Sequence, residues 1–128
     1  MPILAPISAG ELIDKITILR VKAERIGDEA KRVNVAKELR LLERLAAEEL
    51  ASSPSLAALT DRLTEVNAAL WDIEEGKRDC ERRQDFGAEF VRLARAVYRQ
   101  NDRRAAIKRA INSETGSDLV EEKSYQPY

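Results

Sequence analysis

Charged, amide and tyrosine side chains that could bind or transform an anion gather near the two ends of the chain. Close to the N-terminus, Glu11 and Asp14 stand three residues apart and Lys15 follows directly. Carboxylates can act as general acids or bases, and lysine or arginine can stabilise negative charge that develops on a substrate. The second group lies between residues 98 and 125: Tyr98, Asn101, Arg104, Lys108, Asn112, Glu122, Lys123 and Tyr125. The two groups together are the candidate ligand-binding residues.

Three arginines are a separate candidate for anion binding. Arg95, Arg99 and Arg103 repeat every four residues and would share one face of a helix. Guanidinium groups pair in a fork geometry with carboxylates and phosphates. The segment 86–113 carries seven basic and two acidic residues, whereas residues 55–85 carry five basic and eight acidic ones. The alternative is therefore that the basic segment pairs with acidic neighbours, including the C-terminal tail, in a solvated network of salt bridges.

The composition limits which partners the protein could bind and in which cellular compartment it could work. The chain has 128 residues, no histidine, one cysteine and a formal net charge of −1. Nucleic acid is an unlikely partner, because the chain as a whole is not basic and only 5% of its residues are aromatic. A single cysteine cannot form an internal disulfide, and neither a leader sequence nor a membrane span is evident. We expect a cytoplasmic protein without a cofactor.

Paired carboxylates suggest one further chemistry, a magnesium site in an all-helical phosphohydrolase. Glu11 with Asp14, and Asp72 with Glu75, are spaced three residues apart. In parallel helices that begin near residues 8 and 55, Asp14 would lie ~9 Å and Asp72 ~25 Å from the helix starts. Because one ion cannot bridge positions at such different heights, no metal site is expected.

Four helices are expected to position these side chains. Each begins at a capping residue or a proline: Ser8, Asp28, Pro54 and Asp85. Apolar residues then repeat at spacings of three and four, as they do on one face of a helix. The expected helices run from residue 8 to about 26, 28 to about 50, 55 to about 83 and 85 to 116. Gly27 is the expected left-handed end of the first helix, and Gly116 is the expected end of the last.

The short connections between these helices predict an all-α fold, an antiparallel up-down-up-down bundle with long third and fourth helices. Residues 1–116 form the bundle domain, and residues 117–128 form an irregular acidic tail that packs on or near the bundle end. In this topology the end of the fourth helix lies beside the start of the first, which brings both groups of polar residues together. They would form either a structural network of salt bridges or a binding or catalytic pocket. Asn101 and Asp102 are poor helix formers, so we expect either a break in the fourth helix at these residues, which we favour, or polar side chains that line a cavity there.

Four motifs carry a resemblance to a known family. They are ELIDKITIL at residues 11–19, LWDIE at 70–74, NDRRAAIKRAIN at 101–112 and EEKSY at 121–125. Over nearly its whole length, the chain resembles a family of small bacterial proteins classed as a domain of unknown function. The resemblance implies no established activity, ligand or catalytic residue, and only a loose association with tetratricopeptide proteins and surface-polysaccharide genes.

Two functions from different classes remain open. The first is a cytosolic helical interaction or ligand-binding protein that binds an anionic small molecule or a protein partner at its mixed-charge end. It would be a homodimer, because the long helices outreach the first helix and leave apolar surface uncovered. The alternative is an enzyme acting on a phosphorylated or nucleotide-activated substrate. Glu11 or Asp14 would then be the acid or base, and Arg104 or Lys108 the electrostatic clamp. An enclosed pocket favours the enzyme, whereas open, paired charges favour the binding protein.

Overall fold

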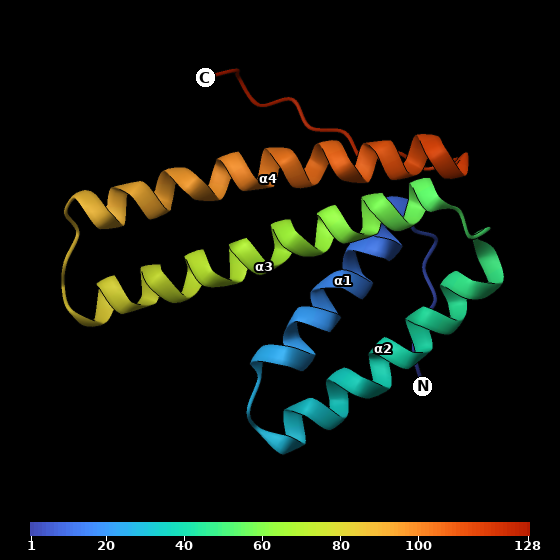
Figure 1. Ribbon diagram of the computed structural model, residues 1–128, viewed down its shortest axis with the longest axis horizontal. Coiled ribbons are helices and arrows are strands. Elements are labelled where there is room, and N and C mark those ends of the chain that lie inside the picture. Colours follow the sequence, from blue (N-terminus) through green and yellow to red (C-terminus); the bar gives the residue numbers. More distant parts are fainter.

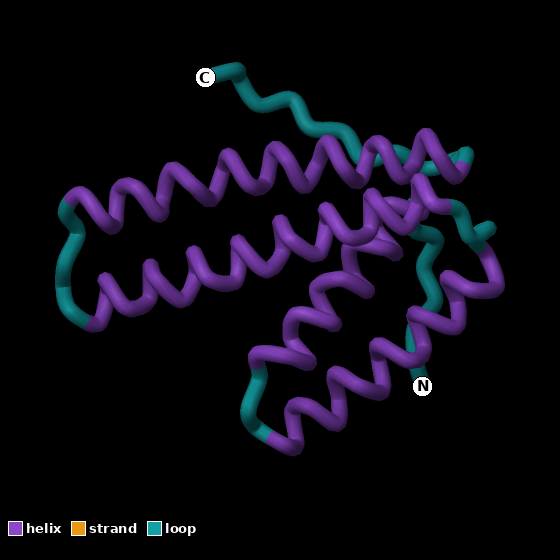
Figure 2. The backbone as a smooth tube through the Cα atoms, in the orientation of Figure 1, coloured by secondary structure: helices purple, strands orange, loops and turns teal.

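The structure, a computed structural model describing residues 1–128, contains four helices and no strand (Figures 1 and 2). The helices are α1 (Ala9–Arg25), α2 (Glu29–Glu49), α3 (Pro54–Arg82) and α4 (Ala88–Thr115). Successive helices run in opposite directions and are joined by short connections (Figure 1). The predicted all-α bundle with long third and fourth helices is confirmed.

Local side chains fix three of the four helix starts. Ser8, Asp28 and Ser53 each accept a hydrogen bond from a backbone amide of the first turn, at 3.0–3.1 Å. These amides have no partner within their own helix, so the caps stabilise the starts of α1, α2 and α3. Pro54 is the first residue of α3, a position where the missing amide proton carries no penalty.

Two of the expected boundaries are wrong. Asp85 does not cap α4; its carboxylate accepts a hydrogen bond from the Gly87 amide two residues on, at 3.1 Å, which makes a local turn. Gly87 itself is the capping residue. The end of α1 is Ile26, in an extended conformation, so Gly27 is not a left-handed cap. Gly116 does end α4, as expected, and it lies in the left-handed region with φ of 67°.

The first helix is central to the packing. α1 packs against α2, α3 and α4, whereas the backbone of α2 approaches only that of α1. The long antiparallel pair of α3 and α4 extends well beyond α1 (Figure 1). The starts of α1 and α3 therefore meet the end of α4 at one end of the molecule.

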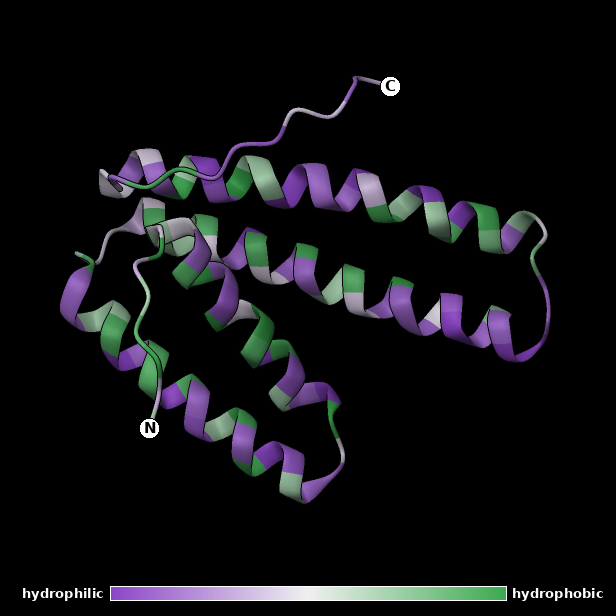
Figure 3. Ribbon diagram, turned by 180° about the vertical axis from the view of Figure 1, so that it is seen from behind, coloured by the Kyte–Doolittle hydropathy of each residue, from purple (hydrophilic) through white to green (hydrophobic).

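The hydrophobic core lies where these three helices meet. Leu63 of α3 and Ile111 of α4 are completely buried, and Ile16 of α1 packs with them. Hydrophobic residues alternate with hydrophilic ones along every helix, as Figure 3 shows. Only 20 of 128 residues are buried, so the core is small and much of the far part of the α3–α4 pair stays accessible.

The expected break in the fourth helix is wrong, because α4 runs uninterrupted through Asn101 and Asp102. The Asp102 carboxylate accepts a hydrogen bond from the Tyr128 hydroxyl at 2.7 Å, so it does not compete for the backbone of its own helix. The nearby Arg104 is bound by a carboxylate of α1. Tertiary partners thus outweigh the weak helix propensity of this segment.

The C-terminal tail, residues 117–128, has no regular secondary structure and runs back along α4 (Figures 1 and 2). All of its residues beyond Ser117 are exposed. None of the helices combines the length and the apolar composition that a membrane crossing requires.

Candidate functional site

A cluster of charged residues occupies the end of the bundle where α1 meets the last turns of α4. We call it the polar cluster, and its members are Glu11, Asp14, Arg104, Lys108, Asn112 and Glu121. The two helices approach closely here because of Gly10, which the sequence analysis missed. Its amide donates to Asn112 Oδ1 at 2.7 Å, and a Cβ atom at residue 10 would lie 2.5 Å from the carbonyl oxygen of Lys108. A glycine in the first turn of a predicted helix was the available signal.

Asp14 is at the centre of the polar cluster, and its side chain is only 1% exposed. Its Oδ1 accepts hydrogen bonds from Arg104 Nε at 2.9 Å and from Asn67 Nδ2 at 3.0 Å. Its Oδ2 accepts a further bond from the second guanidinium nitrogen of Arg104. Because both oxygens are engaged, this carboxylate is compensated by a forked cation and an amide, as a buried charge requires.

Asn67, on α3, is a second residue that the sequence analysis missed. Besides its bond to Asp14, its amide nitrogen donates to Thr17 Oγ1 at 2.9 Å, and Thr17 donates to the carbonyl oxygen of Asp14 at 2.8 Å. All three residues are buried. The signal in the sequence was a polar residue placed between Val66 and Leu70, which both belong to the apolar repeat of α3. A buried amide at such a position needs hydrogen-bond partners on a facing helix.

Lys108 is the second cation of the polar cluster, and its side chain is 8% exposed. Its Nζ donates to Glu11 Oε2 at 2.8 Å and to Glu121 Oε2 at 2.5 Å, and lies 3.9 Å from Asp14 Oδ2. Burial disfavours the charged form of Lys108, but the hydrogen bonds to Glu11 and Glu121 outweigh it and raise its pKa. The same bond lowers the pKa of Glu121.

Arg104 is held in its charged form in the same way. Its hydrogen bond to Asp14 is the main cause of a raised pKa, which burial partly opposes. The polar cluster thus contains two cations and three carboxylates, and no buried side-chain nitrogen or oxygen in the structure lacks a hydrogen-bond partner.

The predicted ligand-binding residues fall into two groups. Five of them meet in the polar cluster: Glu11, Asp14, Arg104, Lys108 and Asn112. Lys15 lies at its rim, about half exposed, with its Nζ 3.6 Å from Glu11 Oε1. From the tail, Glu121 rather than the predicted Glu122 supplies the carboxylate, and Glu122 is exposed and forms no ion pair.

The remaining predicted residues lie further along α4. Tyr98, Asn101, Lys123 and Tyr125 line a hollow of about 460 Å³ between α4 and the tail, which we call the tail hollow. The last residue of the chain, Tyr128, also lines it and stacks on Tyr98 with ring centroids 5.0 Å apart. The residues expected to form one site therefore lie in two neighbouring places along α4, and the tail contacts both.

The arginine face remains free of partners. Arg95, Arg99 and Arg103 are exposed and form no ion pair. The alternative interpretation, that basic residues of α4 pair with acidic residues of α3, is wrong, because no ion pair joins the two helices. The same interpretation also paired α4 with the acidic tail, and such a pair forms at one point only, between Lys108 and Glu121.

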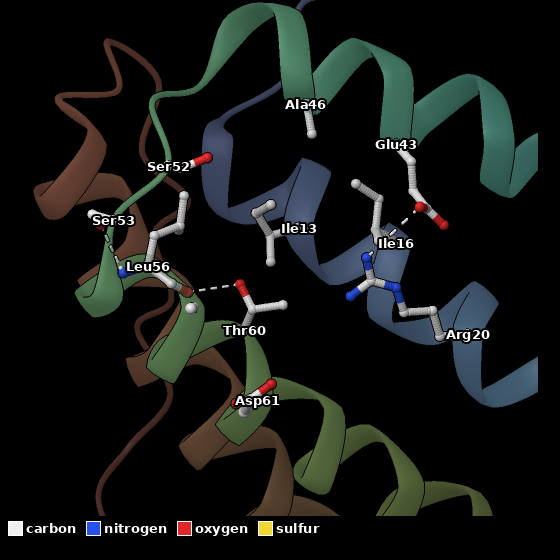
Figure 4. A pocket seen from close by; sticks show the side chains of 11 residues that line it. Ile13, Ile16, Arg20, Glu43, Ala46, Ser52, Ser53, Leu56, Thr60 and Asp61 are labelled. Atoms are coloured by element: carbon white, nitrogen blue, oxygen red, sulfur yellow. Dashed lines mark hydrogen bonds and ion pairs between the residues drawn. The ribbon is translucent and has the colours of Figure 1, made fainter.

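Two further surface hollows adjoin the core. One, of about 360 Å³, lies between α1, α2 and the start of α3, where Arg20 and Glu43 form a long ion pair across its edge (Figure 4). The other, of about 380 Å³, is lined by Trp71 and by the outer side of Arg104. None of the main hollows is lined by Glu11, Asp14 or Lys108.

Comparison with known proteins places the chain in a family. No curated protein and no solved structure matches it significantly. The sequence model of one family, described as a family of unknown function (DUF6165), matches residues 3–128. Because this match covers almost the whole chain, the protein belongs to the DUF6165 family of unknown function.

Proposed function

We propose that this protein is a helical interaction protein that binds a carboxylate or another anionic group at its polar cluster. Lys108 is the anchor. The observation that carries the proposal is its bond to Glu121, in which a largely buried lysine binds a carboxylate from an exposed segment outside the helices. An external anion of similar geometry would meet the same donor.

The geometry supports binding better than catalysis. An acid or base must reach the proton that it transfers, whereas Asp14 is buried and both of its oxygens are engaged. Glu11 is accessible but lines none of the main hollows, so no enclosed pocket excludes water around it. Paired charges outside an enclosed pocket favour a binding protein over an enzyme.

We also propose that the protein works in the cytoplasm as a homodimer. Its lone cysteine is unpaired and buried, which fits a reducing compartment. The α3–α4 pair extends past α1 and exposes about half of Phe86 and Val91, so a second copy would have apolar surface to cover. Light scattering at tens of micromolar should give the mass of two chains, and Val91→Glu should halve it while leaving helix content unchanged. A wild-type chain of single mass would contradict the dimer.

A thermal-shift screen tests the anion site. The compounds are nucleotides, nucleotide-sugars, sugar phosphates and dicarboxylates. A ligand at 100 times its dissociation constant should stabilise the fold by about 2.7 kcal/mol. Lys108→Ala should abolish that shift, whereas Lys37→Ala, which removes an exposed lysine from α2, should keep it. If no anion stabilises the intact protein, or if Lys108→Ala leaves the shift intact, the proposal is wrong.

A further inference from the structure

The C-terminal tail is fixed to α4 at two points beyond its first residue. Near its start, Glu121 accepts the hydrogen bond from Lys108. At its end, Tyr128 stacks on Tyr98 and donates its hydroxyl proton to Asp102. Residues 122–127 lie between these anchors and form no hydrogen bond with the helices.

The tail is longer than the distance it spans. Tyr128 is seven positions after Glu121, and an extended chain of seven steps reaches about 23 Å. On α4, Lys108 is ten positions after Tyr98, which at about 1.5 Å per residue is only about 15 Å. The tail is thus longer than this span requires, and the tail hollow of about 460 Å³ lies between it and α4. The tail therefore covers this part of α4 but leaves a hollow between itself and the helix.

The anchors of the tail are also weakly held. Every residue from Asp118 to Tyr128 is exposed. Water can reach Glu121 and Tyr128, so neither anchor gains the strength of a buried contact. When the tail leaves, Lys108 retains only Glu11 as a hydrogen-bonded carboxylate. An ammonium group has three donors, so a place for an external carboxylate opens.

We propose that the α4 face from Tyr98 to Lys108 is a docking site for an extended acidic peptide segment of a partner protein, and that the tail is its built-in competitor. This rests on the proposed function, because Lys108 is the anchor in both. The partner segment carries a carboxylate for Lys108 and an aromatic side chain for Tyr98, the same two groups with which the tail occupies the face. A partner segment with fewer residues between its carboxylate and its aromatic side chain would reach from Lys108 to Tyr98 without excess length.

The test uses the full chain, so that the helices keep their natural context. Glu121→Gln with Tyr128→Ala weakens both anchors and leaves every helix residue unchanged. The matched control is Asp118→Asn with Val120→Ala, which changes two exposed tail residues that form no side-chain hydrogen bond and do not line the tail hollow. The probe is a fluorescent synthetic peptide with the sequence of residues 119–128, followed by anisotropy.

The weakened-tail variant should bind the probe about tenfold or more tightly than wild type, because an attached tail competes at a high effective concentration. The control should bind like wild type. Adding Tyr98→Ala to the weakened-tail variant should remove most of the gain, and this exposed residue is not part of the polar cluster.

Each outcome has a distinct meaning. Equal affinity in wild type and in the weakened-tail variant overturns the competition by the tail. If neither protein binds the probe while a small anion still raises the melting temperature, the peptide docking site is wrong and the anion site remains. If neither the probe nor any small anion binds, both proposals are wrong.

Discussion

Asp14 and Arg104 are 90 residues apart in the chain, yet Nε of the arginine donates to Oδ1 of the aspartate at 2.9 Å. A second bond joins the other guanidinium nitrogen to Oδ2. This forked pair connects the second turn of α1 to α4 and is buried on the aspartate side. It makes the polar cluster part of the fold as well as a candidate for binding.

The first prediction concerns this pair. Asp14→Asn should lower the free energy of unfolding by about 3–5 kcal/mol, because it leaves a partly buried guanidinium without its counter-charge. Asp61→Asn, at an exposed position of α3 without an ion pair, should change it by no more than about 0.5 kcal/mol. Urea unfolding followed by circular dichroism measures both. Similar small losses in the two variants would show that the pair adds nothing beyond a surface contact.

The second prediction concerns the close approach of α1 and α4. Gly10→Ala should destabilise the protein by about 1–3 kcal/mol, because the new Cβ would lie 2.5 Å from the Lys108 carbonyl oxygen and must push the helices apart. Gly27→Ala is the matched control. It has open space and no left-handed backbone, so it should be neutral or stabilise by about 0.4–1 kcal/mol. Thermal melts would contradict this account if the two variants behaved alike.

Asn67 gives the third prediction. Asn67→Ala removes the hydrogen bonds to Asp14 and Thr17 from a buried position and should cost about 1–3 kcal/mol. Asn34→Ala, on the exposed face of α2, should have little effect. Chemical denaturation compares the two. A double-mutant cycle with Thr17→Val should show coupling, and strict additivity would mean that the three residues do not act as one network.

The fourth prediction is the pH range in which the tail stays attached. The pKa of Glu121 is lowered in the fold, so its contribution is complete above the unfolded value of about 4.3 and is lost as the pH falls through the folded value. The pKa of Lys108 is raised, so its contribution is complete below about 10.4 and is lost as the pH rises through the folded value. Tail amide chemical shifts in nuclear magnetic resonance spectra should therefore change in strong acid and in strong base, with a plateau between.

Two variants separate the groups in that titration. Glu121→Gln should remove the acid transition of the tail, whereas Glu122→Gln should leave its midpoint in place, because Glu122 forms no ion pair. An acid transition that survives in Glu121→Gln would assign the titration to another carboxylate.

The sequence by itself determined the local features of this protein. Apolar residues at spacings of three and four, with Ser8, Asp28 and Pro54 at the starts, were enough to predict four helices, because caps and periodicity depend on neighbours in the chain. Short connections then required antiparallel neighbours, which placed Glu11 and Asp14 beside Lys108. The match to the DUF6165 family over residues 3–128 agrees with the resemblance carried by the motifs.

Tertiary structure decided what depends on contacts between distant residues. The continuity of α4 through Asn101 and Asp102 could not be predicted from helix propensity, because the Asp102 carboxylate is bound by a tyrosine 26 residues away. The choice of Glu121 over its neighbour Glu122 depends on which way an irregular tail turns its side chains, and no periodic pattern records that. The roles of Gly10 and Asn67 likewise come from a helix that packs against them, since a close approach and a buried amide have meaning only where a second backbone or carboxylate is present.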